Sequence, residues 1–107
     1  RQMCIRDSRI SYRSLGAGQL DQLVDLALEQ LNQRLVRHQV QLLLSPALRH
    51  HLASEGYDRR FGARAMARTF RHQLEPVLAR TLLERKPAPG ALLRADLLQG
   101  KIVIDLD

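Results

Sequence analysis

The sequence predicts a single helix-rich α+β domain in which three main helices, one of them long, pack on a small three-stranded sheet. The chain has 107 residues, which suits one compact domain rather than two. Hydrophobic residues make up 45% of the sequence, enough to bury a core without disulfides or a structural metal. The apolar spacing changes along the chain between a helical period and simple alternation, in the order helix, strand, helix, helix, strand, strand.

Composition excludes several classes of protein. No apolar run approaches the roughly 18–20 residues that cross a bilayer, so we expect no membrane partner. Cys4 is the single cysteine, which excludes an internal disulfide framework and a cysteine-based zinc site and favours a reducing, cytoplasmic location. Aromatic residues make up 4% of the chain and Trp is missing, which argues against a surface that stacks the bases of single-stranded nucleic acid.

The charge balance indicates an anionic partner. Seventeen basic residues stand against eleven acidic ones, and all of the basic residues except Lys86 and Lys101 are arginines. Arginine makes bidentate contacts with phosphate and carboxylate groups. A nucleic acid, a nucleotide or an acidic protein surface would each fit, and the codon usage of a GC-rich genome would also explain arginine in place of lysine.

The beginning of the chain is its least regular part. Residues 1–8 follow neither period and we leave them unassigned, with a non-native origin as one interpretation. Residues 9–15 alternate between apolar and polar side chains, which indicates the end of a strand, and Gly16 and Gly18 then interrupt the pattern. The first residue is not Met, which suggests a fragment of a longer protein.

A helix is predicted over residues 19–37, followed by a strand over Val40–Leu44. Apolar residues recur every three or four positions in the helical stretch, at Leu20, Leu23, Val24, Ala27, Leu31 and Leu35. Ser45 then begins a second helix as its N-cap, with Pro46 at the first helical position, where a missing N–H costs nothing. Gly56 is placed to end that helix.

The longest apolar stripe runs from Ala63 to Leu82 and predicts a long helix. Pro76 lies inside this stripe and removes one N–H from the helical ladder, so we expect a kink or a break there. Two alternating runs, Leu92–Leu97 and Lys101–Leu106, predict the final strands, joined by a turn that contains Gln99 and Gly100.

Most residue patterns that carry out catalysis are missing from the sequence. There is no glycine-rich phosphate loop, zinc-protease motif or nucleophile elbow. His50 and His51 are adjacent, so on a helix they would point about 100° apart and could not chelate one metal together. Asp105 and Asp107 are typical of a solvated strand edge. We therefore predict neither metal ligands nor catalytic residues in this chain.

One segment, Glu55–Arg68, combines features of an anion-binding site. Gly62 and Ala63 are small residues where a loop turns into a helix, which lets a ligand or another backbone come close. Arg64 lies in the first turn of that helix, and Arg68 follows one turn later on the same face. A helix start favours anions, so cations there act against the helix dipole and need a reason. A solvated arginine face and a binding site both fit this spacing.

The stretch Gly56–Arg68, GYDRRFGARAMAR, resembles the GYD…GAR sensor-2 motif of Clp-family AAA+ unfoldases, in the small C-terminal subdomain of their second ATPase module. The resemblance covers nearly all of Ile10–Asp107, and Glu75–Ala79 stands where the family commonly has a D-P-L-A-like stretch. It implies that residues 16–107 form this small subdomain and that residues 9–15 end the last strand of the preceding large subdomain.

The resemblance also implies how the segment works. The family's sensor-2 arginine corresponds to Arg64, whose guanidinium would reach the γ-phosphate of ATP; Gly62 and Ala63 match the other motif positions, and Arg68 matches the basic position one turn on. The ATP, with its Mg, would be bound mainly by the large subdomain, and departure of the γ-phosphate would become a rotation of this lid. The implied partners are ATP or ADP, the large subdomain, and neighbouring subunits of a hexameric ring that unfolds proteins; a peptidase partner stays open.

Two departures from the family pattern restrict these implications. Ala65 stands where the family commonly has Pro after the arginine. Residues 4–7 do not match the family's N-R-[IL]-D stretch, so we assign no inter-subunit arginine finger. The Walker A and Walker B residues are also missing, so the chain should not hydrolyse ATP alone.

A small basic nucleic-acid-binding domain is the alternative function. A sequence pI near 10.7 and an arginine-lined helix fit it. The arginines are spread from Arg1 to Arg94 instead of gathering on one recognition helix, which argues against it. In the Clp interpretation we expect an exposed apolar patch around Leu92–Leu106, because a surface made for a partner would be left uncovered.

Overall fold

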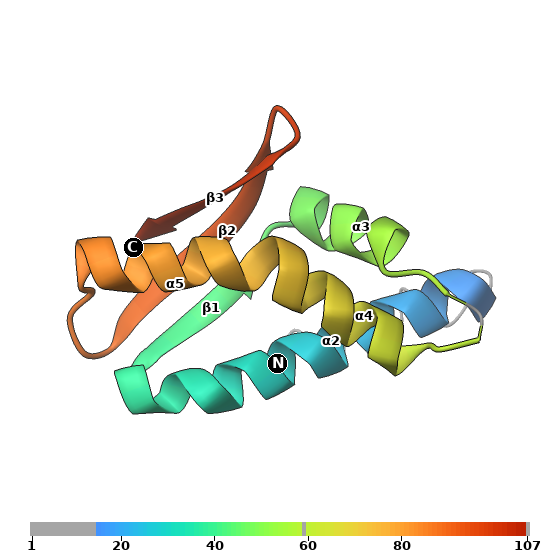
Figure 1. The fold of residues 1–107 in the computed structure, drawn as a ribbon, viewed down its shortest axis with the longest axis horizontal. Helices are drawn as coiled ribbons and strands as arrows, with labels where there is room; N and C mark the ends of the chain where they lie inside the picture. The colour runs from blue at the N-terminus through green and yellow to red at the C-terminus, as the bar shows by residue number, and fades with distance from the viewer. Residues whose placement is uncertain (1–14, 59, 107) are drawn as a thin grey trace.

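The computed structural model describes residues 15–58 and 60–106, which fold as three helical segments packed against a three-stranded mixed sheet (Figure 1). This is the predicted α+β class. The elements in chain order are helix α2 (Leu15–Leu35), the 3-10 turn η1 (Val36–His38), strand β1 (Val40–Leu44), helix α3 (Pro46–Glu55), helix α4 (Ala63–Thr69), the π-helical turn η2 (Phe70–Leu74), helix α5 (Glu75–Arg85), strand β2 (Ala91–Leu98) and strand β3 (Lys101–Leu106).

Helix α2 begins four residues earlier than predicted and contains both Gly16 and Gly18. A glycine inside a helix costs only about 1 kcal/mol, and the buried apolar stripe that follows outweighs this cost. The helix ends at Leu35, and the backbone then turns through η1 to Gln39, whose φ is 56°. The strand end predicted over residues 9–15 lies outside the described residues, apart from Leu15, which is helical.

Strand β1 and helix α3 follow the prediction closely. The Ser45 hydroxyl accepts a hydrogen bond from the Leu48 N–H at 3.1 Å, which makes it the N-cap of α3. It donates a second one to Asp96 Oδ1 at 2.7 Å, so the same side chain joins the start of α3 to strand β2. Gly56 ends the helix, as predicted.

The sheet has the order β1-β2-β3, with β1 parallel to β2 and β3 antiparallel to β2. Strands β2 and β3 form a hairpin whose two loop residues, Gln99 and Gly100, both have positive φ, as a type I′ turn requires. Alternate residues such as Leu93 and Ile104 are buried beneath the helices, while the other face of the sheet is open.

The outer edge of β1 is covered by one side chain from α2. The Asn32 side-chain amide accepts a hydrogen bond from the Leu42 N–H at 2.8 Å and donates one to the Leu42 carbonyl at 3.1 Å. At Leu42, it therefore satisfies the two backbone groups that a further strand would otherwise bind.

The long helix is predicted to kink or break at Pro76, and the structure joins α4 to α5 through an irregular turn directly before this proline. The preceding turn, Phe70–Leu74, is π-helical, and Pro76 lies in the first turn of α5. A wider turn accommodates the missing N–H and the proline ring, which would otherwise clash with the carbonyl four residues earlier. Phe70, Leu74 and Leu78 all remain buried, so the helix keeps one continuous apolar side.

One hydrophobic core holds these layers together, between the helices and the inner face of the sheet. Its most buried large side chains are Phe70, Leu42, Leu48, Leu52, Met66, Leu74, Leu93 and Val24. On the described helices, no stretch is both long enough and apolar enough to span a membrane.

An ion-pair cluster joins α2 to α3 at the edge of the core. Arg49 Nη2 lies 2.7 Å from Asp21 Oδ1 and 2.8 Å from Asp25 Oδ1, and its side chain is 17% exposed. Burial by itself lowers the pKa of Arg49, but the hydrogen bonds and charges of the two carboxylates outweigh it, so the pKa lies above its ordinary value.

We predict that Arg49→Ala lowers the free energy of unfolding by about 1–3 kcal/mol, because it removes the cation that joins two half-buried carboxylates to α3. Urea denaturation of the chain measures the effect. Arg34→Ala is the matched control: Arg34 pairs with Glu75 at 2.7 Å but its side chain is 64% exposed, so its loss should cost less than about 1 kcal/mol. Equal losses in the two variants would contradict a special role for Arg49.

We predict that Ser45→Ala costs about 0.5–2 kcal/mol through the lost N-cap and also raises the pKa of Asp96. That pKa is lowered by the hydrogen bond from Ser45 and, secondarily, by the Leu97 N–H. Because this pKa is lower in the folded chain, the ionised Asp96 stabilises the fold at pH values above the carboxyl group's ordinary pKa, and this stabilisation is lost as the pH falls through the lowered pKa. The stability of the Ser45→Ala variant should therefore depend less on acid pH. NMR titration of the Asp96 carboxyl carbon tests this. Ser54→Ala, which changes an exposed serine near the end of α3, is the control. An unmoved pKa in Ser45→Ala would exclude the Ser45 contact.

Candidate functional site

The residues that the sequence singled out lie in the loop between α3 and α4 and in the first two turns of α4. The loop begins at Gly56, where α3 ends, and finishes at Gly62, directly before the first residue of α4. Three positions of the loop, Gly56, Asp58 and Gly62, determine its shape, each for a different physical reason.

Gly56 is buried where α3 passes close to α4. A Cβ atom at this position would lie 2.7 Å from Met66 Sδ and 3.0 Å from the Leu52 carbonyl oxygen. Met66 is only 1% exposed, so its side chain has little room to move away. The glycine therefore allows the end of α3 to seat against the buried side of α4.

Asp58 organises the middle of the loop. Its Oδ1 atom accepts hydrogen bonds from the N–H groups of Arg60 at 2.8 Å and Phe61 at 3.2 Å. Its backbone carbonyl accepts another from the Gly62 N–H at 2.9 Å. An aspartate that binds the backbone two and three residues ahead stabilises a tight turn, so this residue serves the loop's conformation.

Gly62 makes the transition into α4. Its backbone has φ 46° and ψ −113°, a combination that residues with a side chain avoid. The Arg64 N–H then bonds to the Phe61 carbonyl at 2.9 Å, and the Met66 N–H bonds to the Gly62 carbonyl at 3.2 Å. Helix α4 therefore starts in a defined direction, set by the loop.

The buried side of α4 determines which residues face solvent. Ala65 and Met66 are buried, whereas Ala63, Arg64 and Arg68 are exposed. Ala65 is 8% exposed and packs inward. The arginines therefore project from a helix that is anchored on its opposite face.

Arg64 lies beside an aromatic ring. Its Cζ atom is 5.6 Å from the centre of the Phe61 ring, and the Cζ atom of Arg60 is 5.2 Å from the same centre. These distances suit cation–π contacts. Across residues 15–58 and 60–106, neither guanidinium forms an ion pair with a carboxylate.

The structure brings together Gly62, Ala63 and Arg64 at the start of α4, with Arg68 exposed one turn later. Sequence reasoning missed the roles of Asp58, Arg60 and Phe61. An aspartate four residues before the glycine that precedes a helix is a turn signal, so the role of Asp58 could have been found. The contact of both Arg60 and Arg64 with the Phe61 ring depends on the directions of the side chains, which the sequence spacing does not specify.

Other titratable side chains form hydrogen bonds that join elements of the fold. His51 Nε2 lies 3.0 Å from Gln73 Oε1, and Gln73 Nε2 donates to Glu55 Oε1 at 3.1 Å, so these residues link α3 to the π turn. Among the residues the structure describes, no three His, Cys, Asp or Glu side chains gather closely enough to hold a metal ion. Cys4 and Asp107 lie outside the described residues.

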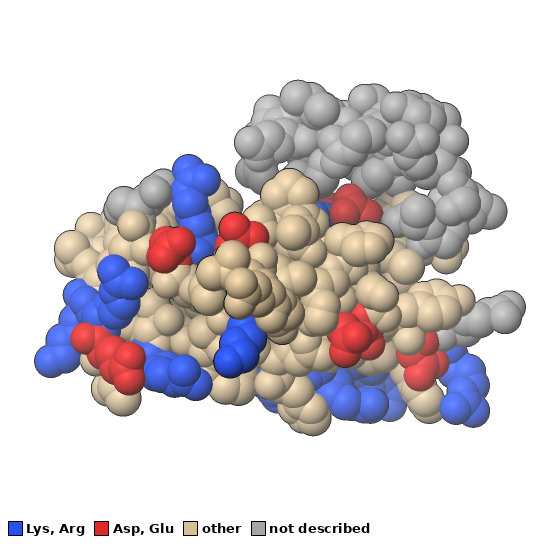
Figure 2. Space-filling view, turned by 90° about the horizontal axis from the view of Figure 1, so that it is seen from above, with Lys and Arg blue, Asp and Glu red and all other residues tan. Residues whose placement is uncertain are grey.

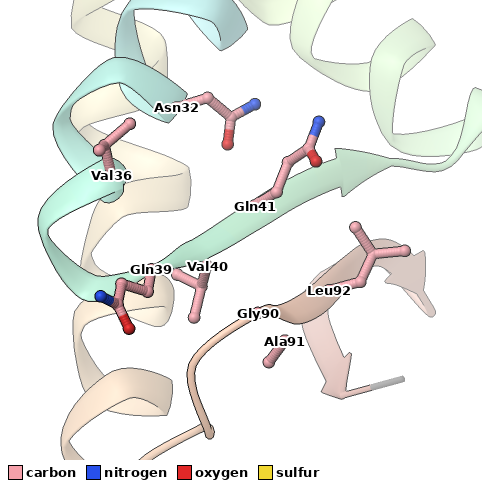
Figure 3. Close-up of a pocket in the computed structure, with 8 residues that line it drawn as sticks. All are labelled: Asn32, Val36, Gln39, Val40, Gln41, Gly90, Ala91 and Leu92. Carbon is pink, nitrogen blue, oxygen red and sulfur yellow. The ribbon is translucent and has the colours of Figure 1, made fainter.

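A separate hollow of about 490 Å³ lies beside β1, at the opposite end of the domain from the loop before α4 (Figures 1 and 3). Figure 3 shows Asn32 reaching toward β1 from α2. The lining residues are Asn32, Val36, Gln39, Val40, Gln41, Gly90, Ala91 and Leu92, none of which carries a charge. The hollow therefore offers no acid, base or nucleophile for chemistry.

Basic residues are distributed over the surface. Figure 2 shows Lys and Arg side chains in several separate groups on the face seen from above, with acidic side chains between them. Among the described residues on this face, the basic side chains do not form a single surface of the kind that tracks a nucleic acid backbone.

The sequence matches the family model described as the C-terminal, D2-small domain of ClpB protein, over residues 15–95. It is 38% identical over 85 residues to the ATP-dependent protease ATP-binding subunit-like protein AmiB of Pseudomonas aeruginosa, a match that covers 78% of this chain and 23% of the relative. It is 32% identical over 96 residues to the chaperone protein ClpB 2 of Thermosynechococcus vestitus, covering 90% of this chain and 11% of the relative. The ClpB of Propionibacterium freudenreichii is 31% identical over 100 residues, covering 94% and 12%. The chain thus spans between about a tenth and a quarter of the length of these curated relatives.

We predict that Gly62→Ala destabilises the chain by about 1–3 kcal/mol, because alanine must adopt a positive φ. Apart from the adjoining residues of the chain, no atom of the described residues lies within 4 Å of the added methyl, so the cost comes from the backbone conformation. Urea denaturation measures the loss. The matched control is a synthetic chain with D-alanine at this position, because a D-residue prefers positive φ and should keep most of the stability. Equal stability of the two alanine variants would show that the loop can change its conformation.

Proposed function

Because the chain belongs to the family of C-terminal, D2-small domains of ClpB proteins, we propose that it serves as the nucleotide-sensing lid of a Clp-type chaperone ATPase. In this function Arg64 contacts the γ-phosphate of ATP bound mainly by a large subdomain. One observation about Arg64 carries the proposal. Its side chain is exposed on a helix whose opposite face is buried, and within the described residues it forms no ion pair with a carboxylate.

A guanidinium in this state suits a phosphate ligand. A charge-assisted hydrogen bond from Arg64 to the γ-phosphate would contribute roughly 1.5–3 kcal/mol when the site is closed. The contact exists with ATP and weakens after the γ-phosphate leaves, so hydrolysis would change the preferred orientation of the lid.

The neighbouring residues support this contact. Gly62 and Ala63 have little or no side chain where the nucleotide would approach, and beyond the chain neighbours no atom of the described residues lies within 4 Å of the position that a Cβ would take at Gly62. Arg68 is exposed one helical turn from Arg64, where its charge would raise the local potential for phosphate. Within the described residues no side chains are grouped to bind Mg, so the ion that accompanies ATP belongs to the large subdomain in this proposal.

We further propose that residues 16–107 form the subdomain and that it packs on the large subdomain and on neighbouring subunits of a hexameric ring. Leu43 and Leu98 are exposed on the open face of the sheet, and Leu92 and Val103 are half-buried there. We assign this face to packing against a partner. The relative in Pseudomonas aeruginosa is described as an ATP-binding subunit-like protein of an ATP-dependent protease, and a peptidase partner for the present ATPase stays open.

We predict that Arg64→Ala, introduced into the complete ATPase, lowers kcat for ATP hydrolysis by about 10- to 100-fold, as expected for a lost charge-assisted contact. Steady-state phosphate release measures this rate. Arg85→Ala is the matched control, because Arg85 is an exposed arginine in the last turn of α5. Urea denaturation of the 107-residue variants should differ by less than about 0.5 kcal/mol. A normal kcat together with normal ATP affinity in Arg64→Ala would refute the proposed contact.

A further inference from the structure

Arg60 and Arg64 meet at one aromatic ring. Their Cζ atoms lie 5.2 Å and 5.6 Å from the centre of the Phe61 ring. Phe61 is 41% exposed, so its ring is not a core side chain and is available to both guanidinium groups. The two arginines come from different elements, Arg60 from the loop and Arg64 from the first turn of α4.

The backbone holds this arrangement from both sides. The Phe61 N–H bonds to Asp58 Oδ1 at 3.2 Å, and the Phe61 carbonyl accepts the Arg64 N–H at 2.9 Å. The Arg60 N–H bonds to the same Asp58 oxygen at 2.8 Å. The ring and the starting points of both arginine side chains are therefore positioned by one hydrogen-bonded loop.

Two positive charges gathered in this way repel each other unless an anion lies near them. Asp58 is the carboxylate of the loop, and its Oδ1 is engaged by two backbone N–H groups. Within the described residues neither guanidinium forms an ion pair. The ring attracts both cations and limits how far they can separate, while both arginine residues remain exposed.

We propose that Arg60 and Arg64 form a two-arginine clamp for a polyphosphate, with Phe61 as the positioning residue that holds them together. The identification of the ligand as the nucleotide's phosphate chain rests on the proposed function. Two guanidinium groups can bind two neighbouring phosphate groups at once, so the clamp prefers a polyphosphate to a single phosphate. Arg60 is thus a second phosphate-binding residue, in addition to the sensor arginine.

The test uses the 107-residue chain and sodium tripolyphosphate, followed by NMR of the arginine side-chain Nε–Hε groups. We expect the signals of Arg60 and Arg64 to shift together with one dissociation constant, and that of Arg85 to shift little. Arg60→Gln should raise the dissociation constant measured at Arg64 by about three- to fivefold. Arg85→Gln is the matched control and should leave this constant unchanged. Inorganic phosphate should bind more weakly than tripolyphosphate at the same ionic strength.

Variants of Phe61 separate positioning from simple stability. Phe61→Leu should weaken tripolyphosphate binding about two- to threefold, whereas Phe61→Tyr, which keeps an aromatic ring, should restore it. The clamp proposal is wrong if tripolyphosphate shifts the NMR signal of Arg64 but not that of Arg60. It is also wrong if Arg60→Gln and Arg85→Gln have the same dissociation constant for tripolyphosphate. These binding results are independent of ATP hydrolysis. If the clamp proposal fails, the proposed contact of Arg64 with the γ-phosphate still stands. If Arg64→Ala has a normal kcat, the nucleotide is no longer the expected ligand, but the measured binding of tripolyphosphate is unaffected.

Discussion

The close packing of Met66 against Gly56 is the contact on which the rest of this site depends. Met66 is almost completely buried, and a methyl group at Gly56 would overlap its sulfur atom. Because Met66 and its neighbour Ala65 occupy the inner side of α4, Arg64 and Arg68 must face outward. The direction of the arginines is therefore a consequence of core packing on the other side of the same helix.

The π-helical turn extends this control to the sheet. It lets the chain pass Pro76 without losing the apolar side that runs from Phe70 through Leu74 to Leu78. The helix that carries the arginines therefore remains packed on the strands through α5, which contacts β3. In the proposed lid, a pull on Arg64 would act on a single packed unit, because cores resist continuous deformation.

The sequence indicates which residues belong to the motif, but it does not show which of them shape the loop and which face solvent. Gly62 was recognised as a small residue at a helix start, and its positive φ supplies the physical reason. Asp58 is part of the sequence motif, but only the folded structure shows that its side chain accepts hydrogen bonds from the Arg60 and Phe61 N–H groups. The sequence predicts a kink or a break at Pro76, and the structure answers with the π-helical turn Phe70–Leu74, because the local cost of a proline can be absorbed by a wider turn while the buried apolar stripe continues.

The sequence by itself determined the class of the domain, the order of its elements and the position of the motif, because periodicity, capping residues and turn residues act over a few neighbouring positions. The N-cap Ser45 and the hairpin at Gln99 and Gly100 belong to this local level. Only the tertiary structure decided that Arg60 and Arg64 share one ring and that Asn32 closes the edge of β1. Such contacts depend on how packed helices and loops orient their side chains, and sequence spacing alone does not determine that orientation.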